Sequence, residues 1–135
     1  MRKFGDKWKL LLARRDEKDP FFPGRPWHIP GGLWKPTAYP EEGLVAILRR
    51  DKELKITSLK IVKKLEWLEW REHPNPFCFP ISLPVVCETD DPIKESVNVC
   101  FFAFSELPSR TMAIHHYDIA CQVFQYLLER DGHDN

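Results

Sequence analysis

The pattern of apolar and polar residues predicts a series of strands interrupted by two helices. The apolar run at residues 8–13 is typical of a buried strand, and the turn residues at 5–7 make it the second strand of a hairpin over residues 2–15. A Pro-rich loop at 19–26 precedes a short strand expected at 27–29. The apolar residues of 59–71 fit neither the three- to four-residue spacing of a helix nor the alternation of a strand, and we expect mostly strand there. Further strands are predicted at 77–87, 97–104 and 112–116.

Two segments have the spacing of an amphipathic helix. In residues 41–54, apolar side chains such as Leu44 and Leu48 recur three and four positions apart, and two glutamates suit the positive end of the helix dipole. In residues 117–130 the same spacing recurs, and Gly132 stands where helices end. This order of elements predicts an α/β (or α+β) fold in a single domain over residues 1–135. A hydrophobic content of 43% is enough for a core.

Composition excludes several classes of protein. The formal net charge is zero, whereas dedicated nucleic-acid binders are usually basic, so we expect no nucleic acid as a partner. No apolar stretch reaches the roughly 20 residues of a membrane helix, and we see no signal-peptide core, so we expect a cytoplasmic protein without membrane contact. The four cysteines are scattered and form no CxxC pair. Such a pattern indicates buried thiols in a reducing compartment.

The charge is distributed unevenly along the chain. Residues 1–71 hold 17 Lys and Arg against 10 Asp and Glu, and residues 72–135 hold 3 against 10. This asymmetry is compatible with solvated surfaces of opposite sign. It is also compatible with a basic wall for phosphates that faces acidic groups able to hold a cation.

Two short segments carry the main functional signal. Residues 9–15 read KLLLARR, and residues 27–32 read WHIPGG. An apolar strand that ends in arginines, followed by a tryptophan strand that runs into Pro-Gly-Gly, resembles the start of the active site in the Nudix hydrolase family. The resemblance covers nearly the whole chain and implies a mixed β-sheet sandwiched between helices. It also implies that Gly31 and Gly32 bend closely around a phosphate and that the Gly32 carbonyl is a metal ligand.

The helix that should carry the chemistry departs from the family's sequence motif. In the family, carboxylates on one helical face bind Mg²⁺ or Mn²⁺, which neutralises a pyrophosphate and activates water. The first Glu of the pattern is replaced by Ala38, and Glu41 is the nearest acid. Two alignments of the helix remain open. In both, Glu53 is the one family carboxylate that survives, and a cation, Arg49 or Arg50, replaces the leading Glu.

A helix motif that has lost carboxylates in this way resembles the motif of the GDP-mannose mannosyl hydrolase branch. That branch uses one metal and a histidine from a later loop as base. This resemblance implies one Mg²⁺ (or Mn²⁺) held by Glu53 and Gly32. It implies pyrophosphate contacts from Arg15 and Arg49, and His115 or His116 as the general base. Trp27 is a candidate for stacking on the base of the substrate.

We therefore expect a Mg²⁺-dependent hydrolase of a nucleoside-diphosphate-linked small molecule, either a nucleotide sugar or a nucleoside polyphosphate. The alternative is a catalytically inactive Nudix fold that binds a nucleotide or a protein. A third interpretation is an interaction domain, for example a homodimer, that uses Trp67 and Trp70. Each site residue also has an ordinary structural explanation: Glu53 in a surface ion pair, Trp27 in the core, and the two histidines on a polar surface.

Overall fold

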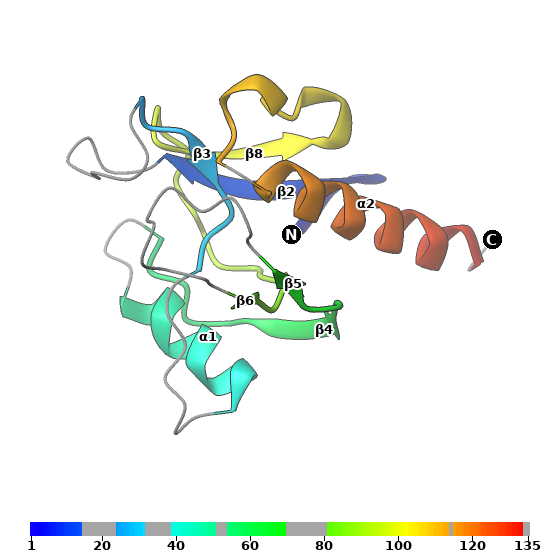
Figure 1. Ribbon diagram of the computed structural model, residues 1–135, viewed down its shortest axis with the longest axis horizontal. Helices are drawn as coiled ribbons and strands as arrows, with labels where there is room; N and C mark the ends of the chain where they lie inside the picture. Colours follow the sequence, from blue (N-terminus) through cyan, green and yellow to red (C-terminus); the bar gives the residue numbers. More distant parts are fainter. Residues whose placement is uncertain (15–23, 32–38, 51–53, 70–80, 114, 134–135) are drawn as a thin grey trace.

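The structure is a computed structural model that describes residues 1–14, 24–31, 39–50, 54–69, 81–113 and 115–133. Among the described helices, none has the length and apolarity needed to cross a bilayer. The elements follow one another (Figure 1) as β1 (Arg2–Phe4), β2 (Lys7–Arg14), β3 (Trp27–His28), α1 (Pro40–Arg50), β4 (Lys60–Lys64), β5 (Leu68–Glu69), β6 (Ile81–Ser82), β7 (Val85–Glu88), β8 (Val99–Ala103), the 3-10 helices η1 (Phe104–Glu106) and η2 (Ser109–Thr111), and α2 (His116–His133).

Strand β2 is the centre of a four-stranded sheet. It pairs antiparallel with β8 along one edge, where Leu11 faces Phe101. Strands β1 and β3 lie one after the other along its opposite edge, β1 beside residues 7–9 and β3 beside residues 13–14. A parallel bridge joins Trp27 to Met112, so the pairing is mixed.

Two smaller antiparallel pairs lie below this sheet in Figure 1: β4 with β7, and β5 with β6. A hydrogen bond from the Leu65 N–H to the Pro84 carbonyl at 2.9 Å continues the β4–β7 pairing by one residue towards β5 and β6. The start of the chain is fixed to β7, because the Met1 amine donates to the Cys87 carbonyl at 2.8 Å. The Thr89 N–H donates to the Met1 carbonyl at 3.3 Å.

The side chains of β2 alternate between two hydrophobic cores. Leu10 and Leu12 pack against α2, which contributes Ile119, Ala120, Val123 and Leu127. Leu11 and Ala13 pack on the other face, against Leu48 of α1 and the residues that follow it. Because both faces of β2 are buried, its sequence is a continuous apolar run and does not alternate. The sheet therefore lies between two helices, which confirms the predicted α/β sandwich.

Some predicted boundaries differ from those observed. The helix predicted at 41–54 is α1, which ends at Arg50; residues 51–53 lie outside the described ranges, and Leu54 is in a turn. The segment at 59–71 contains two short strands, β4 and β5, in its described part. The described part of the strand predicted at 77–87 is two strands, β6 and β7, because Pro84 between them has no N–H for a ladder.

The prediction of a strand at residues 112–116 is wrong. Met112 takes part in a single bridge, and His116 is the first residue of α2. The chain bends at His115, whose φ is +64°, and the His116 N–H donates to the Ala113 carbonyl at 3.1 Å. A non-glycine residue in the left-handed region is uncommon, so the apolar pattern gives no indication of this bend.

Candidate functional site

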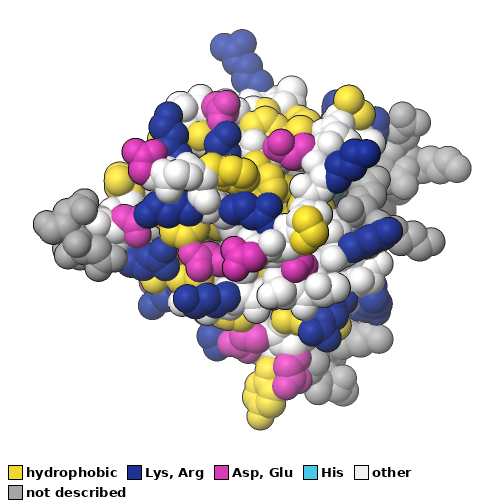
Figure 2. Space-filling model, turned by 180° about the vertical axis from the view of Figure 1, so that it is seen from behind, with side chains coloured by type: hydrophobic (Ala, Val, Ile, Leu, Met, Phe, Trp, Pro, Cys, Tyr) yellow, Lys and Arg dark blue, Asp and Glu magenta, His cyan; other side chains and the backbone are white. Residues whose placement is uncertain are grey.

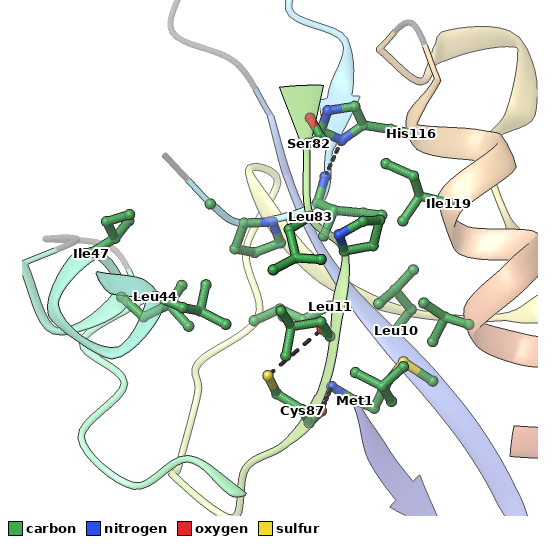
Figure 3. A pocket seen from close by; sticks show the side chains of 18 of the residues that line it. Met1, Leu10, Leu11, Leu44, Ile47, Ser82, Leu83, Cys87, His116 and Ile119 are labelled. Atoms are coloured by element: carbon green, nitrogen blue, oxygen red, sulfur yellow. Dashed lines mark hydrogen bonds between the residues drawn. The ribbon is translucent and has the colours of Figure 1, made fainter. Parts of the chain in front are cut away.

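A cavity of about 490 Å³ lies between the two helices, beside the turn that follows β3. Helix α1 contributes Leu44 and Ile47, and α2 contributes His116 and Ile119. In the view of Figure 3, His116 and Ser82 lie at one end of the cavity, Met1 and Cys87 lie at the other, and Leu10 and Leu11 lie between them. Its volume is within the roughly 300–1,000 Å³ typical of small-molecule sites, so this cavity is the candidate site.

His116 is held firmly at the edge of the cavity. Its side chain is buried, and its Nδ1 accepts a hydrogen bond from the backbone N–H of Ile29 at 2.7 Å. The ring of His28 lies edge-on to it, with 6.2 Å between centroids. An imidazole whose Nδ1 accepts carries its neutral-state proton on Nε2, so in this state His116 is a hydrogen-bond donor and lacks a free basic nitrogen.

The other predicted base, His115, is separated from this position. It is half-buried at the bend before α2 and is not among the residues that line the cavity. Its carbonyl accepts from the Ile119 N–H at 3.1 Å, which begins the hydrogen bonding of the helix. In the structure, His115 therefore has a local role in starting α2, and its predicted catalytic role has no support from the geometry.

Gly31 lies at the mouth of the cavity. It is exposed, and a Cβ built on it would meet nothing within 4 Å. The preceding residues Ile29 and Pro30 also line the cavity. A group that binds there has open access to the glycine backbone.

Trp27 is packed in the sheet and does not line the cavity. Its ring meets Phe102 edge-on at 5.1 Å between centroids, and the Arg14 guanidinium lies over it at 5.5 Å. The Arg14 Nε also donates to the Arg25 carbonyl at 3.2 Å, and Arg25 donates to the Asn98 side chain at 2.8 Å. This packing agrees with a core role for Trp27, the alternative that the sequence left open.

The polar residues of α1 lie away from the cavity lining. Arg49 is exposed in the last turn of the helix. Glu41 is paired with Lys64 of β4 at 2.7 Å, and this hydrogen bond lowers the pKa of Glu41. Among the described residues, no group of three His, Cys, Asp or Glu could hold a metal ion. Arg15, Gly32 and Glu53 lie outside the described residues.

Most polar groups in the cavity wall already have protein partners. The Thr89 hydroxyl donates to the Ser58 carbonyl at 2.8 Å and accepts from the Asp91 N–H at 3.2 Å. Burial raises the pKa of the Cys87 thiol to about 11 and lowers the pKa of the Met1 amine to about 6. The far end of the cavity is therefore largely uncharged at neutral pH.

Asp91 is a structural residue that the sequence did not single out for this role. Its carboxylate accepts hydrogen bonds from the backbone N–H groups of Thr57 and Ser58, the latter at 3.1 Å. These bonds hold the pKa of Asp91 below its ordinary value. Arg2 donates to the carbonyls of Thr89 and Asp91. The bonds from Thr57 and Ser58 to Asp91 position the segment after α1, which includes the buried Ile56 of the cavity wall.

The surface does not present a single-sign wall on the face shown in Figure 2. Basic, acidic and apolar side chains are interspersed there. Cations of the N-terminal half pair with acids of the C-terminal half: Lys3 with Asp131 at 3.5 Å, and Lys9 with Glu106 at 4.0 Å. Exposed pairs of this kind contribute about 0–1 kcal/mol each. On this face neither a basic wall nor separate surfaces of opposite sign are seen, because the two signs are mixed.

Comparison with known proteins identifies the fold. No family model matches the sequence, and no curated protein matches it. The crystal structure of a C. elegans Ap4A hydrolase superposes with a TM-score of 0.70 at 14% identity, covering 93% of this chain and 91% of that chain. The Nudix domain of Shewanella oneidensis NrtR, cocrystallised with ADP-ribose, superposes with a TM-score of 0.63 at 16% identity, covering 93% of this chain and 82% of that one. The chain has the Nudix fold.

Within this Nudix fold, the cavity brings together some predicted site residues and leaves others apart. Gly31 and His116 line it, whereas Trp27, Arg49 and His115 do not. At 14–16% identity the likeness concerns the fold. The resemblance to the GDP-mannose mannosyl hydrolase branch stays a prediction.

Proposed function

We propose that the protein binds a nucleoside-diphosphate derivative in this cavity, with the diphosphate at the turn formed by Pro30 and Gly31. The observation that carries the proposal is the position of the cavity in a Nudix fold: it opens at an exposed glycine and reaches a buried histidine at the start of α2. A structure with a similar fold was cocrystallised with ADP-ribose. His116 supports the proposal by its position, because its buried ring is held by the Ile29 N–H and lies in the cavity lining beside this turn.

Hydrolysis of the bound ligand is the second candidate, and the likeness of the backbone to that of an Ap4A hydrolase favours it. In this form of the proposal, Glu53 and the Gly32 carbonyl would hold one Mg²⁺ (or Mn²⁺), with Arg15 and Arg49 near the diphosphate. The ion would neutralise charge on the diphosphate and activate water. Glu41, the acid nearest to the first carboxylate position of the family pattern, is paired instead with Lys64 at 2.7 Å. We therefore propose ligand binding as the leading function, and we expect any hydrolysis to require Glu53.

Calorimetry with ADP-ribose, in the presence and absence of Mg²⁺, tests both candidates when product is measured by chromatography on the same samples. Binding that persists without Mg²⁺, and no product, is the expected result. Mg²⁺-dependent product that is lost in Glu53→Gln but retained in Glu41→Gln would establish hydrolysis in place of simple binding. Failure of ADP-ribose and ADP to bind under either condition would overturn the proposal.

A charge placed at the mouth of the cavity locates the site. A Cβ at Gly31 meets nothing within 4 Å, and the carboxylate of Gly31→Glu should repel a diphosphate, with a loss of affinity of at least about tenfold. Ser105→Glu adds the same charge on η1 and is the matched control. Equal affinity in both variants would place the diphosphate elsewhere.

A further inference from the structure

We propose that the interior of the cavity receives an aliphatic chain, so that the group attached to the diphosphate is a hydrocarbon and not a sugar. The inference rests on the proposed function, because that function places the diphosphate at Gly31. Gly31 is one of the residues that line the cavity. In the view of Figure 3, the cavity extends from the end marked by His116 and Ser82 to the end marked by Met1 and Cys87, with Leu10 and Leu11 along it. A group attached to the diphosphate would therefore enter the interior of this cavity.

The lining of this space is mainly branched and aliphatic. Leu11, Leu44, Val86 and Ile119 represent four of the elements that line it, β2, α1, β7 and α2. None of the described lining residues has a charged side chain, and Trp67 is the only Phe, Tyr or Trp among them. Trp67 is 56% exposed. A nucleobase is usually held by aromatic stacking and edge hydrogen bonds, so the interior suits a flexible chain better than a base.

Several polar atoms of the wall are already engaged within the protein. The Thr89 hydroxyl is engaged by Ser58 and by the N–H of Asp91. The His116 Nδ1 is engaged by Ile29, and the Cys87 Sγ–H is directed to the Val85 carbonyl at 3.7 Å. A sugar in this space would give up several hydrogen bonds to water and recover few of them, whereas each buried methylene of a hydrocarbon gains affinity.

A series of n-alkyl phosphates from ethyl to octyl, used below their micelle concentrations, tests the inference by calorimetry. We expect the affinity to rise about fourfold for each added methylene, which corresponds to about 0.8 kcal/mol, until the chain fills the cavity. ADP-ribose is measured in parallel as the test of the proposed function itself.

Two pairs of variants locate the chain. Ser82→Phe inserts a ring into the lining, and Ser105→Phe inserts the same ring on exposed η1. Ile47→Glu places a charge in the lining, and Ala46→Glu places it on the exposed side of the same helix. The dependence on chain length should disappear in the two lining variants and persist in the two controls. The second pair keeps the test valid if the first lining variant fails to fold.

The outcomes for the two proposals differ. If ADP-ribose binds but the affinity of the alkyl phosphates does not depend on chain length, the inference of an aliphatic chain is overturned and the proposed function stays intact. An effect of chain length without binding of either ADP-ribose or ADP would support the apolar interior and overturn the nucleoside ligand. A chain-length effect of equal size in both lining variants and their controls would place the chain outside the cavity and overturn the inference.

Discussion

The backbone N–H of Ile29 donates to Nδ1 of His116 at 2.7 Å, and this hydrogen bond joins residues 87 positions apart. It connects the turn that carries Gly31 to the first turn of α2 and adds to the bridge between Trp27 and Met112, which joins the same two segments. The same bond fixes the tautomer of His116 and directs the Nε2 proton away from Ile29. His116 therefore has a structural role whatever its role towards a ligand.

Replacement of His116 by leucine should destabilise the protein, because the Ile29 N–H would lose its acceptor in a partly buried place. We expect the free energy of unfolding to fall by about 1–3 kcal/mol in urea titrations. His116→Asn is the matched variant, since its carboxamide oxygen can accept from the same N–H, and it should retain more of the stability. Equal losses in the two variants would show that the hydrogen bond contributes little.

The same pair of variants separates positioning from base catalysis. If turnover is found, a general base at His116 requires that His116→Asn remove the acidic limb of the pH–rate profile. A positioning role predicts that the shape of the profile is preserved in His116→Asn and that ADP-ribose binding changes together with stability. Loss of that limb would contradict the donor role assigned above.

Asp91 should make stability depend on pH. Hydrogen bonds from Thr57 and Ser58 lower its pKa below the ordinary 3.8. A carboxyl group whose pKa is lower in the folded state stabilises the protein above the unfolded pKa, and this contribution is lost as the pH falls through the folded pKa. We expect Asp91→Asn to be less stable than the wild type at pH 7, and the difference to shrink below about pH 4.

The neighbouring exposed Asp90 provides the control for this measurement. Asp90→Asn should follow the wild-type dependence of the unfolding free energy on pH. The comparison requires chemical denaturation at a series of pH values at constant ionic strength. A difference between Asp91→Asn and wild type that stays constant from pH 7 to pH 3 would contradict the assignment of the lowered pKa.

Cys87 should be a poorly reactive thiol in the folded protein. Burial raises its pKa from 9.0 to about 11, which reduces the thiolate fraction near pH 8 about 100-fold. In a variant in which Cys78, Cys100 and Cys121 are replaced by serine, labelling with Ellman's reagent should be slow and should accelerate when urea unfolds the chain. Rapid labelling under native conditions would show that water reaches the far end of the cavity.

Local sequence patterns were sufficient for the elements that are regular over several residues. The hairpin, β8 and both helices were predicted because apolar runs, turn residues and helical spacing act over short distances. The run at 10–13 also predicted a buried strand, and the structure supplies the reason in the two cores on either side of it.

The candidate site was less accessible to sequence reasoning, because its geometry depends on distant contacts. The bend at His115 separates two adjacent histidines that the sequence treats as equivalent. The role of Asp91 depends on Thr57, 34 positions earlier, and no short pattern encodes that pairing. The apolar interior of the cavity arises from residues of α1, β2, β7 and α2 that come together only in the folded chain.

The pairing of β2 with β8 has a consequence for the order of folding. Leu11 faces Phe101, 90 positions later, whereas β1 and β2 meet within a few residues. During synthesis the β1–β2 hairpin therefore emerges long before the strand that covers its other edge. Until β8 leaves the ribosome, the backbone N–H and C=O groups of that edge are open to pairing with another chain.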